Sequence, residues 1–484
     1  MKKILSLLLL LGSFIVAQAD DLTVCGVTVD LTKSGQITGT GISGQVYYDA
    51  SQRMLKLTNA TLNAETIGIV ANVSPGSMDF RVYLTGKNVI NSGRVSVRAD
   101  NNILFCGNGD LELNGPGNFI NKCKMTVYAC RVTVNSTGDD AFHSMDNGKA
   151  DLVLSYHGAL KATCNGTVLK NFNDITYNTG KLLSGSPTGK EMMIGDDYKL
   201  EIGGIKVTPF NRDNVSGSNI QGKVSVSFLD NFNSVKVSLD NATISGSNYG
   251  IDFTDKGKPI TLALKGNNAI TATSRGLTST TGTNCSAYNI EGKGSDKLTI
   301  TSATGISHQG DVKVKDCVFE INGRSYAMDL WNYGKLTVDN ATVHAKATYS
   351  GGIAIAKLTG VTYLNGCTET EPLRASFHQE SKSISIDTNE NLSEVTIEPT
   401  YGVIVCGQML KKSMGTSTFS ITGEGITGSV TYDPKRNFLT LTDGAELGLV
   451  GNYKEHPATI EVLYLNHTAV PDYGRLTISS EGNG

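Results

Sequence analysis

The stretch LTVCGV at residues 22–27 recurs twice in this chain, as LEIGGI at residues 200–205 and as VIVCGQ at residues 403–408. The three stretches align without gaps, and each leads into a bend that contains glycine. After the bend, apolar and polar residues alternate, which is the pattern of a half-buried β-strand. Because self-similarity at long intervals is typical of a repeated module, we predict two complete copies and one shorter copy of a single module.

A β-hairpin is predicted near the start of each copy. The alternating strand ends in a turn that is rich in Asp, Asn and Pro, residues that favour reversal of the chain. A second apolar stretch follows each turn and forms the return strand. The predicted turns lie at residues 49–53, 230–234 and 433–436.

The first two copies keep corresponding beyond the hairpin. NATL at residues 59–62 matches NATI at residues 241–244, and LTGKNVI at residues 84–90 matches LKGNNAI at residues 264–270. The third copy stops early, so we expect its uncovered last strand to pair with another molecule of this chain. The predicted modules are residues 20–199, residues 200–400 and a truncated module at residues 401–484.

A shorter rhythm runs through the second copy, in which apolar strands begin about 22 to 28 residues apart. Parallel strands need a crossover of a dozen or more residues, and no segment has the period of a crossover helix. A coiling chain supplies that crossover itself. We therefore predict an all-β fold of right-handed parallel β-helix modules, each opened by a β-hairpin. The alternative is an antiparallel β-sandwich in each module, which also gives short strands and frequent turns.

Residues 1–19 have the features of a signal peptide. Lys2 and Lys3 precede an apolar run at residues 4–16, and AQA at residues 17–19 has the form of a cleavage site. The apolar run is too short to span a bilayer, and no later stretch approaches the required length. We expect an exported protein, extracellular, at the cell surface or periplasmic, whose mature chain has no membrane span.

Charge and cysteine content argue against several classes of partner and cofactor. The net charge of −3 provides no basic surface for nucleic acid. The nine cysteines are too few for a disulfide-held scaffold, and their spacings do not match a zinc site, so we expect buried thiols. No phosphate-binding or dinucleotide-binding motif lies between a strand and a helix. The sequence therefore predicts no cofactor and no metal site.

The segments GKVSV, LDNATI and LKGNNAI, within residues 222–270, carry a family resemblance. They resemble the repetitive secreted β-helix proteins of gut-type bacteria, many of which are described as carbohydrate-binding-domain proteins and which look like relatives of the pectate-lyase-like superfamily. The resemblance covers nearly all of the mature chain. It implies a scaffold more than an activity, because the matching residues are those that build turns.

One motif resembles the catalytic elements of a glycoside hydrolase. GDD at residues 138–140, followed by His157 and Gly158, looks like the Gly-Asp-Asp and Gly-His-Gly elements of polygalacturonases, which need two carboxylates flanking the scissile bond. Tyr156 stands where the first glycine of the second element belongs, and no Arg-x-Lys follows. We assign no catalytic residue and keep a polysaccharide-degrading enzyme, of polygalacturonase or lyase type, as an alternative.

The predicted binding residues are Tyr326, Trp331 and Tyr333, in a segment that holds the only tryptophan of the chain. Exposed rings can stack on sugar faces, although the same rings can also pack within or between coils. We expect a non-catalytic β-helix protein that binds carbohydrate or another ligand of a host or bacterial surface. A structural adhesin stalk is a further alternative.

Overall fold

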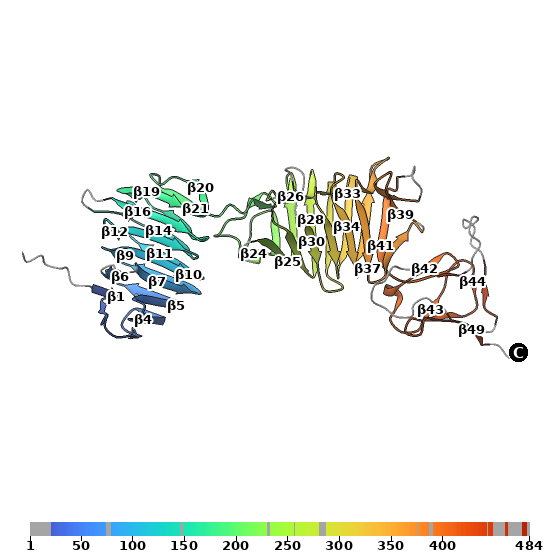
Figure 1. The fold of residues 1–484 in the computed structure, drawn as a ribbon, viewed down its shortest axis with the longest axis horizontal. Coiled ribbons are helices and arrows are strands. Elements are labelled where there is room, and N and C mark those ends of the chain that lie inside the picture. Colours follow the sequence, from blue (N-terminus) through green and yellow to red (C-terminus); the bar gives the residue numbers. More distant parts are fainter. Residues whose placement is uncertain are drawn as a thin grey trace, which may run out of the picture. The chain divides into compact units, whose positions relative to one another are not determined.

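The computed structural model is almost entirely β-structure, with 63% of its residues in strands (Figure 1). The described part of the chain contains no α-helix and one 3₁₀ turn, η1 (Lys412–Met414). The first compact unit ends at Asp197 and includes Thr208–Phe210, and the second comprises Tyr198–Val207 and the chain from Asn211 onward. The structure describes residues 21–73, 79–145, 149–229, 233–255, 257–279, 287–373, 375–386, 391–442, 444–448, 460–462 and 477–481.

In the first unit, successive coils stack their strands in parallel on three faces. The first face consists of the first half of β5 (Met54–Ala64), with β7 (Phe80–Thr85), β10 (Ile103–Gly107), β13 (Lys124–Tyr128), β16 (Ala150–Ser155) and β19 (Phe172–Tyr177). The second face consists of the second half of β5, with β8 (Lys87–Ser92), β11 (Asp110–Gly115), β14 (Arg131–Ser136) and β17 (Ala159–Thr163). The third face consists of β6 (Ile67–Asn72), β9 (Val95–Ala99), β12 (Asn118–Ile120), β15 (Asp140–His143) and β18 (Thr167–Lys170).

The second unit repeats this arrangement. Its first face consists of the first half of β25 (Ser234–Gly246), with β27 (Ile260–Lys265), β30 (Tyr288–Glu291), β32 (Val312–Lys315), β34 (Lys335–Asp339) and β37 (Gly360–Leu364). Its second face consists of the rest of β25, with β28 (Asn267–Ala272), the first parts of β31 (Lys297–Ser307) and β33 (Val318–Asp329), and β35 (Thr342–Ala347). Its third face consists of β26 (Tyr249–Phe253), β29 (Arg275–Thr278), the ends of β31 and β33, and β36 (Ile353–Ala356).

These stacks form a β-solenoid of about 12 turns, so the predicted fold class is confirmed. Successive coils pair in parallel, which excludes the antiparallel sandwich. The predicted signal peptide at residues 1–19 lies outside the described residues. The described part of the chain contains no helix with the length and apolar character needed to cross a membrane.

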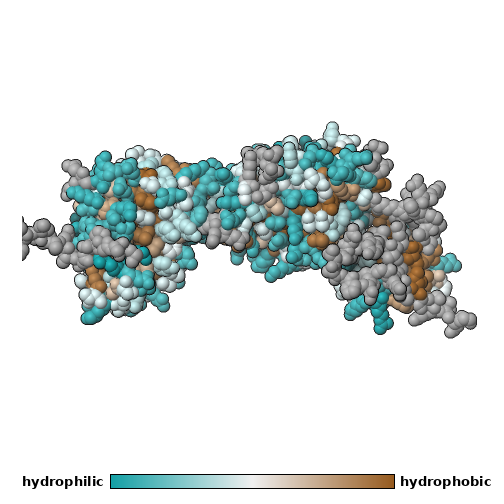
Figure 2. Space-filling model, viewed as in Figure 1, coloured by the Kyte–Doolittle hydropathy of each residue, from teal (hydrophilic) through white to brown (hydrophobic). Residues whose placement is uncertain are grey.

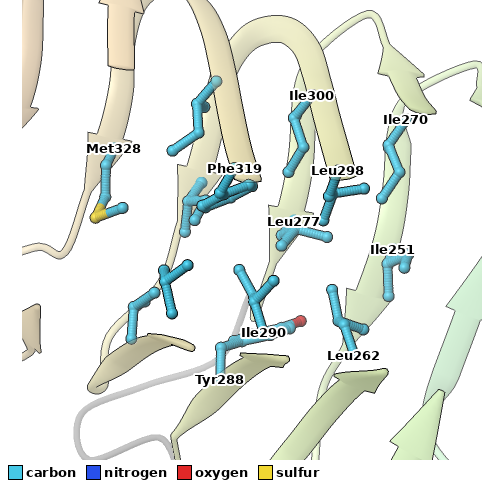
Figure 3. Packing of buried hydrophobic residues seen from close by; sticks show 14 of the residues in the cluster. Ile251, Leu262, Ile270, Leu277, Tyr288, Ile290, Leu298, Ile300, Phe319 and Met328 are labelled. Carbon is cyan, nitrogen blue, oxygen red and sulfur yellow. The ribbon is translucent and has the colours of Figure 1, made fainter. Parts of the chain in front are cut away.

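The core consists of columns in which like residues lie over like residues, and this explains the short sequence rhythm. Figure 3 shows Leu262, Ile270 and Leu277 directed into the interior from three different strands. All fifteen residues of the three central columns in the second unit are buried. The columns are Val237, Leu262, Ile290, Val314 and Val338 on the first face, Ile244, Ile270, Ile300, Ile321 and Ala345 on the second, and Ile251, Leu277, Ile306, Met328 and Ile355 on the third.

A buried asparagine closes the corner between the first and second faces in both units. Asn268 accepts a hydrogen bond from the Ala242 N–H at 2.8 Å and donates to three backbone carbonyls at 3.2 to 3.3 Å. Asn88 accepts from the Ala60 N–H at 2.9 Å and donates in the same way. Because a sharp corner leaves backbone groups without strand partners, this side chain satisfies groups that would otherwise be buried unpaired. The matched LTGKNVI and LKGNNAI segments contain these two residues.

The third face packs closely against the second because glycine stands just before its inward column in several coils. A Cβ added at Gly276 would lie 2.1 Å from the Ile300 Cγ2 and 2.6 Å from the Gly305 carbonyl oxygen. A Cβ added at Gly250 or Gly305 would meet the isoleucine of the next coil in the same way. The glycines therefore allow the isoleucine column of the second face to fill the corner.

The recurrent opening stretch forms a cap on the first coil. In the first copy, β1 (Asp21–Val24) and β2 (Val27–Thr28) form a tight hairpin around Cys25 and Gly26, whose φ values of 49° and 78° are those of a type I′ turn. β1 also pairs antiparallel with β6, and β4 (Ile42–Asp49) pairs antiparallel with β5. Antiparallel strands thereby cover the edges of the first coil, which would otherwise be open to other chains.

The same cap opens the other two copies, and the predicted hairpin is present in each. In the second copy, β22 (Leu200–Ile202) pairs with β23 (Ile205–Lys206) and β26, and β24 (Ile220–Leu229) pairs with β25. In the third copy, β41 (Glu394–Val405) pairs with β42 (Gln408–Lys411) and β48 (Ile460–Val462), and β45 (Val430–Asp433) pairs with β46 (Phe438–Thr442).

Antiparallel strands also cover the last coils. β21 (Glu191–Gly195), which pairs with β20 (Lys181–Gly185), lies antiparallel on β17. β41 lies antiparallel on β35 and on β38 (Cys367–Glu371) before it opens the third copy, so one strand serves both copies. The remaining described strands are β3 (Gly35–Gln36), β39 (Ser376–His378), β40 (Ser383–Ser385), β43 (Phe419–Ile421), β44 (Ile426–Thr427), β47 (Glu446–Leu447) and β49 (Thr477–Glu481).

Candidate functional site

Trp331 occupies a tight turn at the end of the third face of the second unit, between β33 and β34. Trp331 and Asn332 have φ values of 52° and 68°, and the Tyr333 N–H donates to the Leu330 carbonyl at 3.0 Å. A bulky side chain rarely adopts a positive φ. The turn therefore holds its tryptophan in a conformation that the surrounding structure must support.

Two hydrogen bonds support this conformation. The Trp331 backbone N–H donates to the Asp329 Oδ1 at 3.0 Å, and its indole Nε1–H donates to the Ser307 Oγ at 3.0 Å. Ser307 and Asp329 are partners on neighbouring strands and are themselves buried. The tryptophan is thus held at both its backbone and its ring edge, while 40% of the residue stays exposed.

Lys357 joins the predicted residues Tyr326 and Trp331 into one cluster. Its Nζ lies 4.9 Å from the Tyr326 ring centroid, 5.1 Å from the Trp331 ring centroid and 2.7 Å from the Asp329 Oδ2. Attraction between the ammonium and the two rings adds to the ion pair. We call Ser307, Tyr326, Asp329, Trp331 and Lys357 the Trp331 cluster.

The predicted residue Tyr333 is not part of this cluster. It is 47% exposed and follows the turn. Among the described residues, its ring does not stack on the ring of Tyr326 or of Trp331. The sequence prediction also missed Lys357, Asp329 and Ser307. Register explains the omission, because Asp329 pairs with Ser307 on one side and with Ala356, next to Lys357, on the other.

The Trp331 cluster can offer a ligand an aromatic surface and a cation. Its indole N–H is already used inside the fold, so a ligand would meet the ring rather than the donor. The Lys357 ammonium has three donor hydrogens, and its hydrogen bond to Asp329 uses one of them. A rigid aromatic ring beside hydrogen-bond donors is suited to a flat ligand that carries both apolar and hydroxyl groups.

The glycoside hydrolase motif is divided between separate parts of the first unit. Asp140 begins β15 on the third face, where its Oδ2 lies 3.1 Å from the His143 Nδ1 and 3.2 Å from the Lys170 Nζ. His157 lies in the turn between the first and second faces and hydrogen-bonds Asp196. Asp139 is exposed. These side chains do not form the facing pair of carboxylates that glycoside hydrolysis needs.

The described cysteines are free thiols, most of them buried. Burial raises the pKa of Cys123 and of Cys317 to about 12, far above the range of a reactive thiolate. Within the described residues, no group of three or more His, Cys, Asp and Glu side chains is placed to hold a metal ion.

Glu369 is one of the buried acids of the second unit. It is 6% exposed and accepts a hydrogen bond from the Tyr363 hydroxyl. Burial raises the pKa of Glu369 because the charged carboxylate is poorly solvated there. Tyr363 and Glu369 lie on β37 and β38, which pack at the end of the second unit, so we interpret the pair as part of the closing structure.

Comparison with family models, with curated proteins and with solved structures finds no match for this chain.

Proposed function

We propose that this protein is a non-catalytic β-solenoid that binds carbohydrate at the Trp331 cluster. The observation that carries the proposal is an exposed tryptophan in a left-handed turn, fixed by hydrogen bonds from both its backbone and its indole N–H. Such a ring is immobilised before any ligand arrives, so binding loses little side-chain entropy.

Carbohydrate suits this surface better than other ligand classes. Sugar rings present an apolar face of C–H groups beside hydroxyls, so they can stack on the indole while hydroxyls accept from the Lys357 ammonium. A pocket for a small apolar ligand would need deeper enclosure than an exposed turn provides. The proposal includes export, with the ligand a glycan of a host or bacterial surface, in keeping with the resemblance to secreted carbohydrate-binding β-helix proteins.

Intrinsic fluorescence tests the proposal directly, because Trp331 is the only tryptophan. A panel of oligosaccharides would be titrated into the full chain, and a ligand that stacks on the indole should shift the emission in a saturable way. Trp331→Asn should lower the affinity, measured by calorimetry, by about tenfold or more, which corresponds to about 1.4 kcal/mol. Asparagine tolerates a positive φ, so this variant removes the ring without straining the turn.

Tyr349→Ala serves as the matched control, since Tyr349 is 64% exposed in another turn of the second unit. Its affinity should equal that of the unchanged chain. Full-strength binding to Trp331→Asn of the oligosaccharide that shifted the emission of the unchanged chain would refute the site. An absence of glycan binding across the panel would refute the function and favour the structural stalk.

A further inference from the structure

A column of exposed tyrosines runs along the first face of the first unit. Tyr47, Tyr83 and Tyr128 are 37%, 39% and 41% exposed and lie on β4, β7 and β13. The residues between them are Lys56 and Cys106, so every second strand carries a tyrosine. The register runs Tyr47 to Lys56, Lys56 to Tyr83, Tyr83 to Cys106 and Cys106 to Tyr128.

The β-solenoid does not require tyrosine at these positions. The second unit shares the corner asparagine and the strand pairing, which allows the equivalent positions to be compared. None of them is aromatic, and two are charged. The equivalent residues are Ser225, Ser238, Ala263, Glu291 and Lys315.

Apart from the Lys56 Nζ, which lies 5.8 Å from the Tyr47 ring centroid, the three tyrosines have no role in the described polar contacts. Within the described part of the chain, the hydroxyls of Tyr47, Tyr83 and Tyr128 have no hydrogen-bond partner. Tyr128 stacks on Tyr156, with ring centroids 5.2 Å apart and planes at 9°, which lengthens the aromatic stripe. An exposed apolar ring with a free hydroxyl is a feature of binding surfaces more than of packing.

Two lysines near the column form ion pairs. The Lys56 Nζ lies 2.8 Å from the Asp49 Oδ2, and the Lys124 Nζ lies 3.0 Å from the Asp79 Oδ2. Cys106 is 9% exposed. A ligand lying on the column would therefore meet neutral rings and hydroxyls beside two lysines that are already paired. Figure 2 shows one face of the molecule, on which the first unit is mostly hydrophilic or neutral with narrow hydrophobic areas.

The spacing of the column identifies a class of ligand. Neighbouring strands lie about 4.8 Å apart, so successive tyrosines are about 9.6 Å apart and the three span about 19 Å. One sugar unit of an extended β-linked chain is about as long as one strand spacing, and alternate units present the same ring face. We propose that the tyrosine column binds an extended, uncharged β-linked polysaccharide that runs along the solenoid axis.

A glycan fits this stripe better than a protein partner. Stable protein interfaces bury about 800 Å² on each side, whereas the column is one side chain wide. The proposal concerns a surface separate from the Trp331 cluster, and it stands if carbohydrate binding at Trp331 fails.

Calorimetry with β-1,4-linked gluco-oligosaccharides of two to eight sugars tests this proposal on the full chain. Affinity should rise with length up to about five or six sugars and then level off, because Tyr47 and Tyr128 occupy the first and the last of five successive strand positions. Tyr83→Ala should lower the affinity for the hexasaccharide by about tenfold, whereas Tyr83→Phe, which keeps the ring, should stay within about threefold. Tyr349→Ala should leave this affinity unchanged.

Three results would overturn the proposal. The first is equal affinity of Tyr83→Ala and the unchanged chain for the hexasaccharide. The second is equal binding of an α-linked or a negatively charged hexasaccharide. The third is a combination of two findings: the unchanged chain binds no glycan, and the triple variant Tyr47→Ala, Tyr83→Ala, Tyr128→Ala has a different oligomeric state. That combination would assign the column to self-association.

Discussion

Replacement of Asn268 by alanine should weaken the second unit severely, because one side chain satisfies four backbone groups at a buried corner. The Ala242 N–H would lose its acceptor, and leaving a buried donor unpaired costs about 1 to 3 kcal/mol. The carbonyls of Lys265, Gly266 and Lys297 would each lose the hydrogen bond from Asn268. This loss costs less, because a carbonyl oxygen can accept a second hydrogen bond from the backbone. We expect a loss of about 3 kcal/mol in the free energy of unfolding.

Urea denaturation followed by tryptophan emission measures this loss, because Trp331 reports on the unit that contains Asn268. With a urea dependence of about 3 kcal/mol per molar, the midpoint should fall by about 1 M. Asn289→Ala is the control. Asn289 lies on the outer side of the first face and makes one long hydrogen bond of 3.5 Å, so its midpoint should move by less than about 0.2 M. Equal shifts in the two variants would refute the assignment of the corner bonds.

Three further predictions concern packing, protonation and thiol reactivity. Gly276→Ala should lower the free energy of unfolding by about 2 to 3 kcal/mol by the same fluorescence assay, whereas Gly257→Ala, whose added Cβ meets only one atom at 3.9 Å, should not. Burial raises the folded-state pKa of Glu369, so ionisation of this side chain destabilises the fold as the pH rises from about 4.3 through that pKa. Glu369→Gln should therefore be more stable than the unchanged chain at neutral pH. In urea titrations, this difference in the free energy of unfolding should vanish below about pH 4. In site-resolved mass spectrometry of native protein alkylated at pH 8, the buried Cys317 should react far more slowly than the half-buried Cys25, and equal rates would contradict the burial described here.

The sequence predicted the solenoid because its core is periodic. Apolar residues such as Leu262 and Ile290 recur once per coil, and the turn residues between them recur as well. The three opening stretches were recognised as equivalent, but their role as a type I′ hairpin and edge cap was not. The Cys25–Gly26 pair carries that signal, since both positions need a positive φ.

The candidate sites were harder to predict because they depend on which residues of different coils lie side by side. The coils differ in length, so sequence distance does not give register. Trp331 and Tyr326 were found because they are near in sequence, whereas Lys357 comes from the next coil. The tyrosine column was missed for the same reason, since its members are separated by whole coils and align only when every turn is counted.

Distances along one outward column test the stacked arrangement most directly. In the structure, Lys236 is followed on the first face by Thr261, Asn289, Lys313, Thr337 and Thr362, one per coil. Spin labels at position 236 and at position 313, 337 or 362 should give pulsed-EPR distances of about 14, 19 and 24 Å, a rise of about 5 Å per coil. Distances that do not increase in sequence order along this series would contradict the parallel β-solenoid of the second unit and the Trp331 cluster built on it.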